Sequence, residues 1–372
     1  MRVAVIGHTY VVDANRGKWR ALAPRCEAIR LFVPKTWPER DFWVRENEAA
    51  DDLDIFPLSA VDAGRARRWH VRLATLRREF AAFRPDIVHV EAESGSIIAM
   101  ACVFARAGWR TTQFVWENIP IDSSWRRRLA KWNLSAVDYL FCGSTGAFET
   151  ARCDGYSGDA SVVAQVGVDL AAADRAPAFR PAGDDRFVIG FVGRMDAKKG
   201  VHVLAESFRI LDDDASELVF LGDGPDREAL RSHVAASPFA SQVRFVDPVP
   251  HADVAAHIKG FDVLVLPSIS TPGWKEQFGH VLIEAMACKV PVIGTRCGAI
   301  PEVIGDAGIV VDEGDATALA GAIARLINDA GERNRLLRAG RERVESRYTD
   351  AAIADTMHGA WSDLHNGPIR GA

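Results

Sequence analysis

The chain has 372 residues, of which 48% are hydrophobic and 26% charged, and its formal net charge is −5. This composition is ordinary for a soluble globular protein, and the length exceeds a single core, so two domains of roughly 150–200 residues each are expected. The weak acidic balance gives no general indication of nucleic-acid binding.

The cysteines and the apolar segments indicate the compartment. Six cysteines occur without a C-x-x-C pair, which favours a reduced, cytoplasmic protein. The N-terminal MRVAVIGH has too short an apolar run for a signal peptide, and no stretch approaches the roughly 18–20 apolar residues that span a bilayer. Any membrane association is therefore expected to be peripheral, at the inner face of the membrane.

The two halves of the chain differ in the sign of their charge. Residues 1–180 hold 25 Lys and Arg against 22 Asp and Glu, whereas the remainder holds 20 against 28.

The sequence of the first half predicts a parallel α/β sheet. Short apolar runs with helix-like stretches between them predict buried strands at Arg2–Ile6, Asp86–Val90, Thr112–Trp116 and Tyr139–Cys142.

The pattern restarts after Asp174–Asp185, a segment rich in Pro, Ala and charge that is typical of a linker. Strands are expected at Phe187–Val192, Glu217–Leu221, Val243–Val246, Asp262–Pro267, Pro291–Thr295 and Gly308–Val311, followed by helices over Asp315–Arg347 and Ala351–Leu364. The expected domains are an N-terminal Rossmann-like domain over 1–177, a C-terminal Rossmann-like domain over 178–345, and a final helix over 346–372.

The first motif with chemical meaning follows the strand Phe187–Val192 and reads GRMDAKKG, from Gly193 to Gly200. Glycine lets the backbone approach a ligand closely, and the next helix offers a positive N-terminus to a diphosphate. Arg194 can hold two phosphate oxygens, and Lys199 adds a point charge. The alternative is a surface turn with solvated cations. The G-x-x-x-x-G-K-[ST] pattern is absent, so this is no P-loop.

The second motif follows the strand Asp262–Pro267 and its loop. It contains two glutamates, Glu276 and Glu284, on either side of a helix start expected near Gly279. Backbone N–H groups around Phe278, Gly279 and His280 would face an anion at such a helix start. Glu276 would lie at the carboxyl end of the strand, where open α/β sheets bind ligands. The alternative is a capped amphipathic helix with two exposed glutamates.

The segments GRMDAKKG, LGDGP (Leu221–Pro225) and Glu276–Ile304 resemble, in order and spacing, the C-terminal half of glycosyltransferase family 4. Gly167–Asp169 resembles the segment that precedes the linker in that family, and the N-terminal half matches loosely. The resemblance implies the GT-B fold, in which two Rossmann-like parallel-sheet domains face a central cleft and a C-terminal helix returns to the N-terminal domain. It also implies retention of configuration.

The resemblance further implies roles for single residues. Arg194 and Lys199 would bind the donor diphosphate, with Gly193 beside them, and Glu284 would bind the ribose. Glu276 would hold hydroxyls of the transferred sugar. The amides near Phe278, Gly279 and His280 would help to bind phosphate, and the backbone near Val249 would meet the base.

The N-terminal half departs from the family pattern at three places. The expected Gly-Gly loop is replaced by a stretch in which Gly17 is the best match, so Gly17 is the candidate donor contact. Glu117 replaces a histidine after a mid-domain strand, and we expect it to act in catalysis. Glu91 and Glu93 stand in place of part of an H-x-H pattern. They would position or deprotonate an acceptor hydroxyl, or else form a salt-bridged rim.

Two D-x-D sequences, Asp52–Asp54 and Asp212–Asp214, resemble the metal-binding signature of other glycosyltransferases. Asp212–Asp214 precedes a strand and reads as a helix-ending turn, and Asp52–Asp54 lies in an acidic, solvated stretch. The histidines show no H-x-x-x-H pattern. We therefore expect no metal and no cofactor besides the nucleotide-sugar donor.

Two basic stretches interleave arginine with tryptophan, at Arg65–Arg78 and Ser124–Leu134, and the second contains Arg126, Arg127 and Arg128. Such composition is typical of an interfacial helix against anionic lipid or of the acceptor side of an enzyme. The alternative is a half-buried helix with a charged outer face. No nucleic-acid-binding signature accompanies the charge.

The sequence therefore predicts a metal-independent, retaining hexosyltransferase in cell-envelope or polysaccharide biosynthesis. It would move a hexose-type sugar from a nucleotide diphosphate to a glycan, lipid-linked or small-molecule acceptor. Two alternatives stay open: a nucleotide-sugar epimerase on the same fold, and a non-catalytic nucleotide-sugar-binding subunit. A dehydrogenase is disfavoured because no G-x-G-x-x-G follows the first strand.

Overall fold

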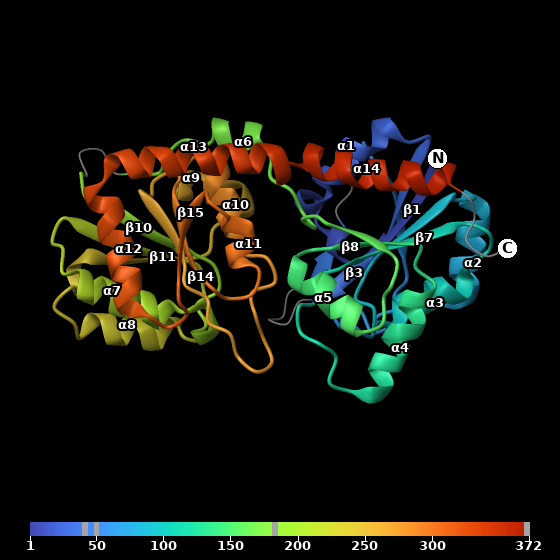
Figure 1. Ribbon diagram of the computed structural model, residues 1–372, viewed down its shortest axis with the longest axis horizontal. Helices are drawn as coiled ribbons and strands as arrows, with labels where there is room; N and C mark the ends of the chain where they lie inside the picture. Colours follow the sequence, from blue (N-terminus) through green and yellow to red (C-terminus); the bar gives the residue numbers. More distant parts are fainter. Residues whose placement is uncertain (39–43, 48–51, 181–184, 368–372) are drawn as a thin grey trace. The chain divides into compact units, whose positions relative to one another are not determined.

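A computed structural model describes residues 1–38, 44–47, 52–180 and 185–367. The chain divides into two compact units (Figure 1). The first combines Met1–Gly167 with Asp350–Ala372, and the second is Val168–Thr349. These boundaries fall between residues 167 and 168 and between 349 and 350, where the sequence suggested 177/178 and 345/346.

The first unit contains a seven-stranded parallel sheet of order β5-β2-β1-β6-β7-β8-β9. Its strands are β1 (Arg2–Gly7), β2 (Ala28–Pro34), β5 (Asp54–Leu58), β6 (Ile87–Glu91), β7 (Arg110–Val115), β8 (Tyr139–Cys142) and β9 (Asp159–Val162). A separate antiparallel ribbon pairs β3 (Thr36–Pro38) with β4 (Val44–Glu46). The four strands expected in this half are present, and β2, β5 and β9 extend the sheet.

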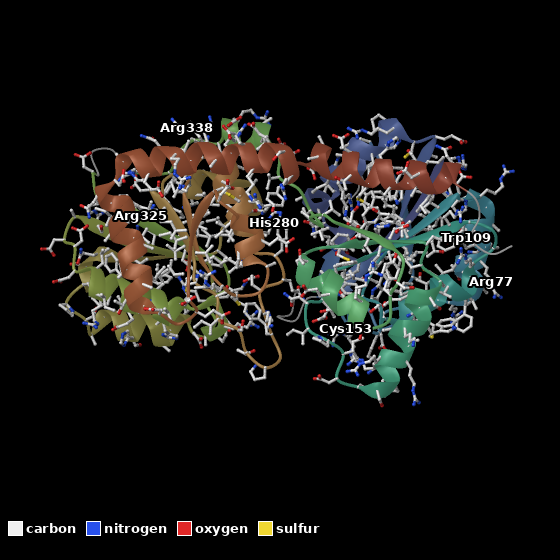
Figure 2. All side chains as sticks on the ribbon, in the orientation of Figure 1. Arg77, Trp109, Cys153, His280, Arg325 and Arg338 are labelled. Atoms are coloured by element: carbon white, nitrogen blue, oxygen red, sulfur yellow. The ribbon has the colours of Figure 1, made fainter. Side chains whose placement is uncertain are left out.

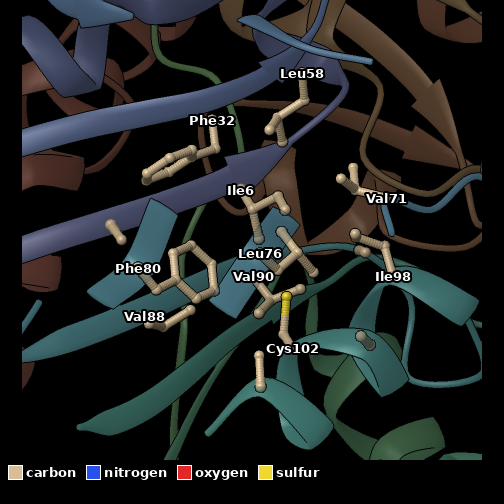
Figure 3. Close-up of a cluster of buried hydrophobic side chains, with 14 of the residues drawn as sticks. Ile6, Phe32, Leu58, Val71, Leu76, Phe80, Val88, Val90, Ile98 and Cys102 are labelled. Atoms are coloured by element: carbon tan, nitrogen blue, oxygen red, sulfur yellow. The ribbon is translucent and has the colours of Figure 1, made fainter. Parts of the chain in front are cut away.

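The helices of the first unit fall into two groups. The first comprises α2 (Leu73–Phe83), α3 (Ile97–Ala105), α4 (Ser124–Ser135) and α5 (Thr145–Cys153). The second comprises α1 (Gly17–Leu22) and α14 (Asp350–Asn366), which pack on each other. Figure 3 shows the core beneath α2 and α3, where Leu76, Phe80, Ile98 and Cys102 meet side chains of the sheet.

Strand β6 shows how the sheet separates an apolar face from a polar one. Successive side chains of a strand point to opposite faces. Val88 and Val90 enter the core below α2 and α3, so His89 and Glu91 face the other side, toward α1 and α14. Trp361 of α14 lies there, 5.5 Å from His89 between ring centroids, and its indole N–H donates to Thr112 Oγ1 at 3.2 Å. The final helix therefore completes the core of the first unit.

The second unit contains a six-stranded parallel sheet of order β12-β11-β10-β13-β14-β15. Its strands are β10 (Phe187–Val192), β11 (Ser216–Leu221), β12 (Val243–Val246), β13 (Val263–Leu266), β14 (Val292–Thr295) and β15 (Gly308–Val311). Its helices are α6 (Leu170–Arg175), α7 (Val201–Leu211), α8 (Arg227–Ala235), α9 (His251–Ile258), α10 (His280–Ala287), α11 (Ile300–Ile304), α12 (Ala316–Asn328) and α13 (Ala330–Arg347). Helix α7 packs on α8 and α12, and α10 packs on α6, α9 and α13. Both sheets are parallel and Rossmann-like, as the sequence predicted.

The short 3-10 helices are η1 (Thr9–Val11), η2 (Asp13–Arg16), η3 (Ala23–Arg25), η4 (Ala197–Lys199) and η5 (Ala240–Gln242). The helical stretch expected over Asp315–Arg347 is present and consists of two helices, α12 and α13, which are separated at Asp329. The Asp329 carboxylate accepts from the Glu332 backbone N–H at 2.8 Å and so caps the second helix.

None of the described helices is long and apolar enough to cross a bilayer.

Candidate functional site

Glycine-rich loops follow β10 and β11 at the carboxyl edge of the second sheet. Gly193 has a φ of +146°, and a Cβ on Gly222 would lie 2.2 Å from the Gly193 carbonyl oxygen. A Cβ on Gly224 would likewise lie 2.2 Å from the Met195 carbonyl oxygen. Only glycine permits this approach, so the Leu221–Pro225 segment lies directly against the loop that carries Arg194.

The two cations of this loop have different surroundings. The Lys199 ammonium donates to Glu276 Oε2 at 2.6 Å, and the two side chains are 23% and 9% exposed. The ammoniums of Lys198 and Lys199 both lie over the Trp274 ring, at 5.1 and 5.2 Å from its centroid. The Arg194 side chain is 53% exposed, and its Nε lies 3.8 Å from Asp196 Oδ2. Lys199 is thus held in the site, whereas Arg194 reaches toward solvent.

Glu276 is fixed by several chain segments. Its Oε2 also accepts from the Ser268 hydroxyl at 2.8 Å, directly after β13. Its carbonyl oxygen accepts from the Ala299 N–H at 3.0 Å, and a Cβ on Gly298 would lie 2.0 Å from that oxygen. The carboxylate, though buried, therefore has a defined position and a paired cation.

Helix α10 begins where the sequence predicted. Gly279 is its N-cap with a φ of +82°, a conformation that favours glycine. The first backbone N–H groups of an α-helix have no partner within the helix and attract anions. The ring of Phe278 lies edge-on to Tyr348, at 5.7 Å between centroids.

Glu284 lies one turn into α10 and faces two histidines. Its Oε1 is 3.3 Å from His280 Nδ1 and 4.0 Å from His251 Nδ1. Figure 2 labels His280 at the start of this helix. Burial alone would raise the pKa of Glu284, but the hydrogen bond and charge of His280, with the charge of His251, lower it. His251 follows Val249 closely along the chain, so the loop expected to meet the base lies near the carboxylate expected to meet the ribose.

Glu93 and Glu117 lie together in the first unit, after β6 and β7. The backbone N–H groups of Trp116 and Glu117 donate to Glu93 Oε1, each at 2.9 Å, and Arg67 donates to Glu117 Oε2 at 2.5 Å. Burial, together with the charge of Glu117, raises the pKa of Glu93 to about 8. The two carboxylates expected on the acceptor side are therefore neighbours, and only Glu117 is partly exposed, at 24% of its side chain.

Glu91 has different surroundings from Glu93 and is not part of a rim. Its side chain is fully buried on the α1 side of the sheet, where its Oε1 accepts from Lys18 Nζ at 2.6 Å and lies 3.2 Å from His89 Nε2. Burial would raise the pKa of Glu91, but Lys18 and His89 lower it to about 2. The Glu91 carboxylate therefore has a packing role inside the first unit and is sealed from an acceptor.

Gly17 begins α1, and its backbone approaches α14 closely. A Cβ at this position would lie 1.9 Å from Asp350 Oδ2. The close approach of the Asp350 side chain favours glycine here, so packing accounts for this residue without a donor contact.

Only the second of the two basic stretches is a helix along its whole length. Arg65–Arg78 is not one helix, because Val61 and His70 bridge across a turn, Trp69 is fully buried, and α2 begins only at Leu73. Ser124–Leu134 is helical, as α4. Arg126 is half-buried, Arg128 is exposed, and Arg127 donates to the Ile121 carbonyl oxygen.

The D-x-D sequences have structural roles. Asp52 pairs with Arg20, Asp54 pairs with Arg30, and Asp212 ends α7 in a left-handed conformation. Among the described residues, no group of three or more His, Cys, Asp or Glu has the arrangement of a metal site.

Sequence reasoning missed three contributors to the second-unit site: Ser268, Trp274 and His251. The position of Ser268 immediately after a buried strand was the available signal. Trp274 and His251 carried none, because their contacts depend on loop conformation.

Comparison with known proteins identifies relatives of the second unit. Residues 174–343 match the family described as Glycosyl transferases group 1. The capsular polysaccharide biosynthesis glycosyltransferase CapM of Staphylococcus aureus is 34% identical over 182 residues, 48% of this chain and 47% of the relative. The D-inositol 3-phosphate glycosyltransferase of Pseudarthrobacter chlorophenolicus is 33% identical over 242 residues, 61% of this chain and 56% of the relative. The chain thus aligns with about half the length of these curated relatives.

Solved structures show the same fold over the whole chain. Sucrose-phosphate synthase of Thermosynechococcus elongatus superposes with a TM-score of 0.75 at 20% identity, covering 98% of this chain and 99% of that one. Anabaena HepE in complex with UDP gives a TM-score of 0.76 at 15% identity, covering 98% and 100%. The fold is therefore GT-B, and the match to Glycosyl transferases group 1 lies within the second unit.

Proposed function

We propose that this protein is a retaining glycosyltransferase that moves a hexose from a nucleotide diphosphate donor to an acceptor in cell-envelope or polysaccharide biosynthesis. The observation that carries the proposal is the Lys199–Glu276 ion pair at 2.6 Å. It lies beside the start of α10, within the segment that matches group 1 glycosyl transferases.

In this proposal the second unit binds the donor. The diphosphate meets the N–H groups at Phe278, Gly279 and His280, and Arg194 and Lys199 supply positive charge. The Glu284 carboxylate accepts hydrogen bonds from the hydroxyl groups of the ribose. Its lowered pKa keeps it ionised and therefore able to accept these bonds. In the same proposal, the backbone of Gly193 contacts the phosphate and the backbone of Val249 contacts the base.

The chemistry follows from where charge develops. As the C1–O bond to the diphosphate breaks, negative charge grows on the leaving oxygen, and preorganised cations stabilise it. The acceptor oxygen bonds to C1 from the same face, and its proton passes to the leaving phosphate oxygen. Lys199 is already fixed by Glu276, whose carboxylate also accepts from the Ser268 hydroxyl, so little reorganisation is needed. Glu276 orients the sugar hydroxyl groups.

We propose that these cations do the work that a metal ion does in other glycosyltransferases. Turnover should therefore persist in EDTA. Loss of all turnover in EDTA, with recovery on addition of Mg²⁺ or Mn²⁺, would contradict this part of the proposal.

On the acceptor side, the proposal uses Glu117 and Glu93. Glu117 is partly exposed and paired with Arg67, so it can position an acceptor hydroxyl. Glu93 fixes the backbone of Trp116 and Glu117 and acts as a positioning residue. Gly17 stays a candidate donor contact beside its packing role.

The direct experiment incubates the protein with a panel of nucleotide sugars, with and without cell-envelope extracts, and measures release of nucleoside diphosphate. Acceptor-dependent release is expected. Interconversion of sugars without release would support an epimerase, and donor binding without release under any acceptor would support a non-catalytic subunit.

A further inference from the structure

The first unit has a large pocket that is lined by both arginine and apolar side chains. Its volume is about 1560 Å³, and every residue that lines it belongs to the first unit. The walls are the loop before α2, the first turns of α3 and α4, Trp37 of β3, and His8 directly after β1. Its rim includes Glu117, the acceptor-side carboxylate of the proposed reaction.

The cationic wall carries Arg65, Arg67, Arg68 and Arg126. Arg65 and Arg68 share a single carboxylate, Asp62, at 3.9 and 3.3 Å, and Arg67 pairs with Glu117. Four arginines against two carboxylates leave a net charge of +2 around the pocket. Burial lowers the pKa of His8 to about 4, so this ring adds no charge at neutral pH.

The arginine side chains remain accessible to a ligand. Those of Arg65, Arg67 and Arg68 are 62%, 47% and 63% exposed. A guanidinium presents several donors in one plane and matches phosphate oxygens two at a time. A neutral sugar would leave this charge unused, whereas a phosphate monoester or diester would neutralise it.

The apolar wall follows one face of each of two helices. Ile97 and Met100 come from α3, and Trp125 and Leu129 come from α4. Their spacings of three and four residues place each pair on one side of its helix. Trp37, which is stacked on His8 at 4.2 Å between ring centroids, adds an aromatic surface to the lining.

The same two helical faces continue beyond the pocket into an exposed aromatic pair. Phe104 follows Met100 by four residues and Trp132 follows Leu129 by three, and their rings lie 4.9 Å apart. Phe104 is 52% exposed, Trp132 40% and Trp125 66%. An apolar stripe thus runs from the pocket along α3 and α4 to the exposed Phe104 and Trp132.

We propose that this pocket binds a phosphate-bearing amphiphile, with the phosphate on the arginine wall and the hydrocarbon chain along the α3–α4 stripe. This inference rests on the proposed function, in which the amphiphile is the acceptor and its hydroxyl-bearing group meets Glu117. The shared chemistry of phospholipids and polyprenyl phosphates, an anionic head with an apolar chain, is what the pocket recognises.

The test measures binding alone, by calorimetry, with no donor present. The probes are dodecyl phosphate below its micelle concentration, butyl phosphate, inorganic phosphate and dodecyl maltoside. Dodecyl phosphate should bind far more tightly than butyl phosphate, by about fourfold for each methylene that becomes fully buried. Inorganic phosphate and the uncharged detergent should bind weakly, because each satisfies only one wall.

Variants assign the two walls. The double variant R68A/R126A should weaken dodecyl phosphate binding by at least about tenfold, the loss expected for charge-assisted hydrogen bonds. The control Arg209→Ala removes an exposed arginine of the second unit, paired with Glu206, and should change binding less than twofold. Trp132→Ala should weaken dodecyl phosphate but leave butyl phosphate unchanged.

Each contrary outcome overturns the inference. Equal binding of inorganic and dodecyl phosphate would reduce the pocket to an anion site, and equal binding of dodecyl maltoside would remove the role of the arginines. Equal effects of R68A/R126A and Arg209→Ala would place the ligand elsewhere.

A second set of experiments distinguishes the two possible kinds of lipid and separates this inference from the proposed function. Competition of dodecyl phosphate by dioleoylphosphatidic acid or by farnesyl phosphate distinguishes the diacyl from the prenyl chain. Sugar transfer to a neutral soluble acceptor with no dodecyl phosphate binding would sink this inference and leave the proposed function standing. Binding without transfer to any acceptor would do the reverse.

Discussion

The adjacent lysines Lys198 and Lys199 provide a matched pair of perturbations. Both ammoniums lie over the Trp274 ring at nearly the same distance, yet only Lys199 donates to Glu276, at 2.6 Å. Lys198 instead lies 3.4 Å from Asp196 Oδ2. Replacing each lysine by alanine removes the same charge from the same loop, so the comparison isolates the position of the charge.

The expected size of the Lys199→Ala effect follows from its role. A preorganised group that stabilises charge on the leaving oxygen contributes about 10²–10³ in kcat, or about 3–4 kcal/mol. The Lys199 side chain is only 23% exposed, which supports an effect of that size. Lys198→Ala, whose side chain is 35% exposed, should lower kcat by less than about threefold, a typical surface effect.

The assay is nucleoside diphosphate release under saturating donor, with the melting temperature of each variant as the control for folding. A selective loss of kcat in Lys199→Ala, with a melting temperature near that of the wild type, supports the reasoning. Equal kcat values for the two variants would refute it.

Three further predictions concern binding, stability and pH. Glu284→Ala should weaken binding of the donor nucleotide by about tenfold, since hydrogen bonds to a charged group contribute about 1.5–3 kcal/mol, whereas the exposed Glu206→Ala should not; equal calorimetric affinities would argue against the ribose assignment. Lys18→Met should destabilise the first unit by about 3–5 kcal/mol in urea unfolding by leaving the buried Glu91 carboxylate without its ammonium partner, and K18M/E91L should recover most of this loss; no recovery would mean that the cost lies in packing. Because the pKa of Glu93 is raised to about 8 in the folded protein, its contribution to stability should fall as pH rises from about 4.5 to 8, by at most about 1.4 kcal/mol per unit. Glu93→Gln should therefore flatten the melting-temperature profile over that range, and an unchanged profile would contradict the raised pKa.

Buried strands were predictable because they are continuous apolar runs. Tyr139–Cys142, Phe187–Val192, Val243–Val246 and Gly308–Val311 have the bounds that the sequence suggested. Three strands of the first sheet were missed: β2 lies between β5 and β1 and carries Arg30 within its apolar run, whereas β5 and β9 lie at the two edges. Edge strands tolerate proline and exposed polar residues, as in DIFPL and DASV, so they lack that signal.

Site residues were predictable where a motif carried them and not where packing brought them together. The helix start at Gly279 could be read locally, because a glycine before an apolar periodic stretch marks a boundary. The Lys199–Glu276 contact joins residues 77 positions apart, and the Lys18–Glu91 contact joins residues 73 apart. Nothing in the sequence distinguishes Glu91, sealed against α1, from Glu93 two positions later. Strand alternation would place both residues on the same face. They differ because β6 ends at Glu91, whereas Glu93 lies in the following loop and accepts from the backbone N–H groups of Trp116 and Glu117.

A crystal structure of the protein with UDP bound would test the donor site most directly. The account predicts the diphosphate within hydrogen-bonding distance of the backbone N–H groups at Gly279 and His280, with Arg194 and Lys199 beside it. It also predicts that the ribose hydroxyl groups donate hydrogen bonds to the Glu284 carboxylate. A nucleotide bound elsewhere in the second unit, or in the first unit, with Glu284 untouched would contradict it.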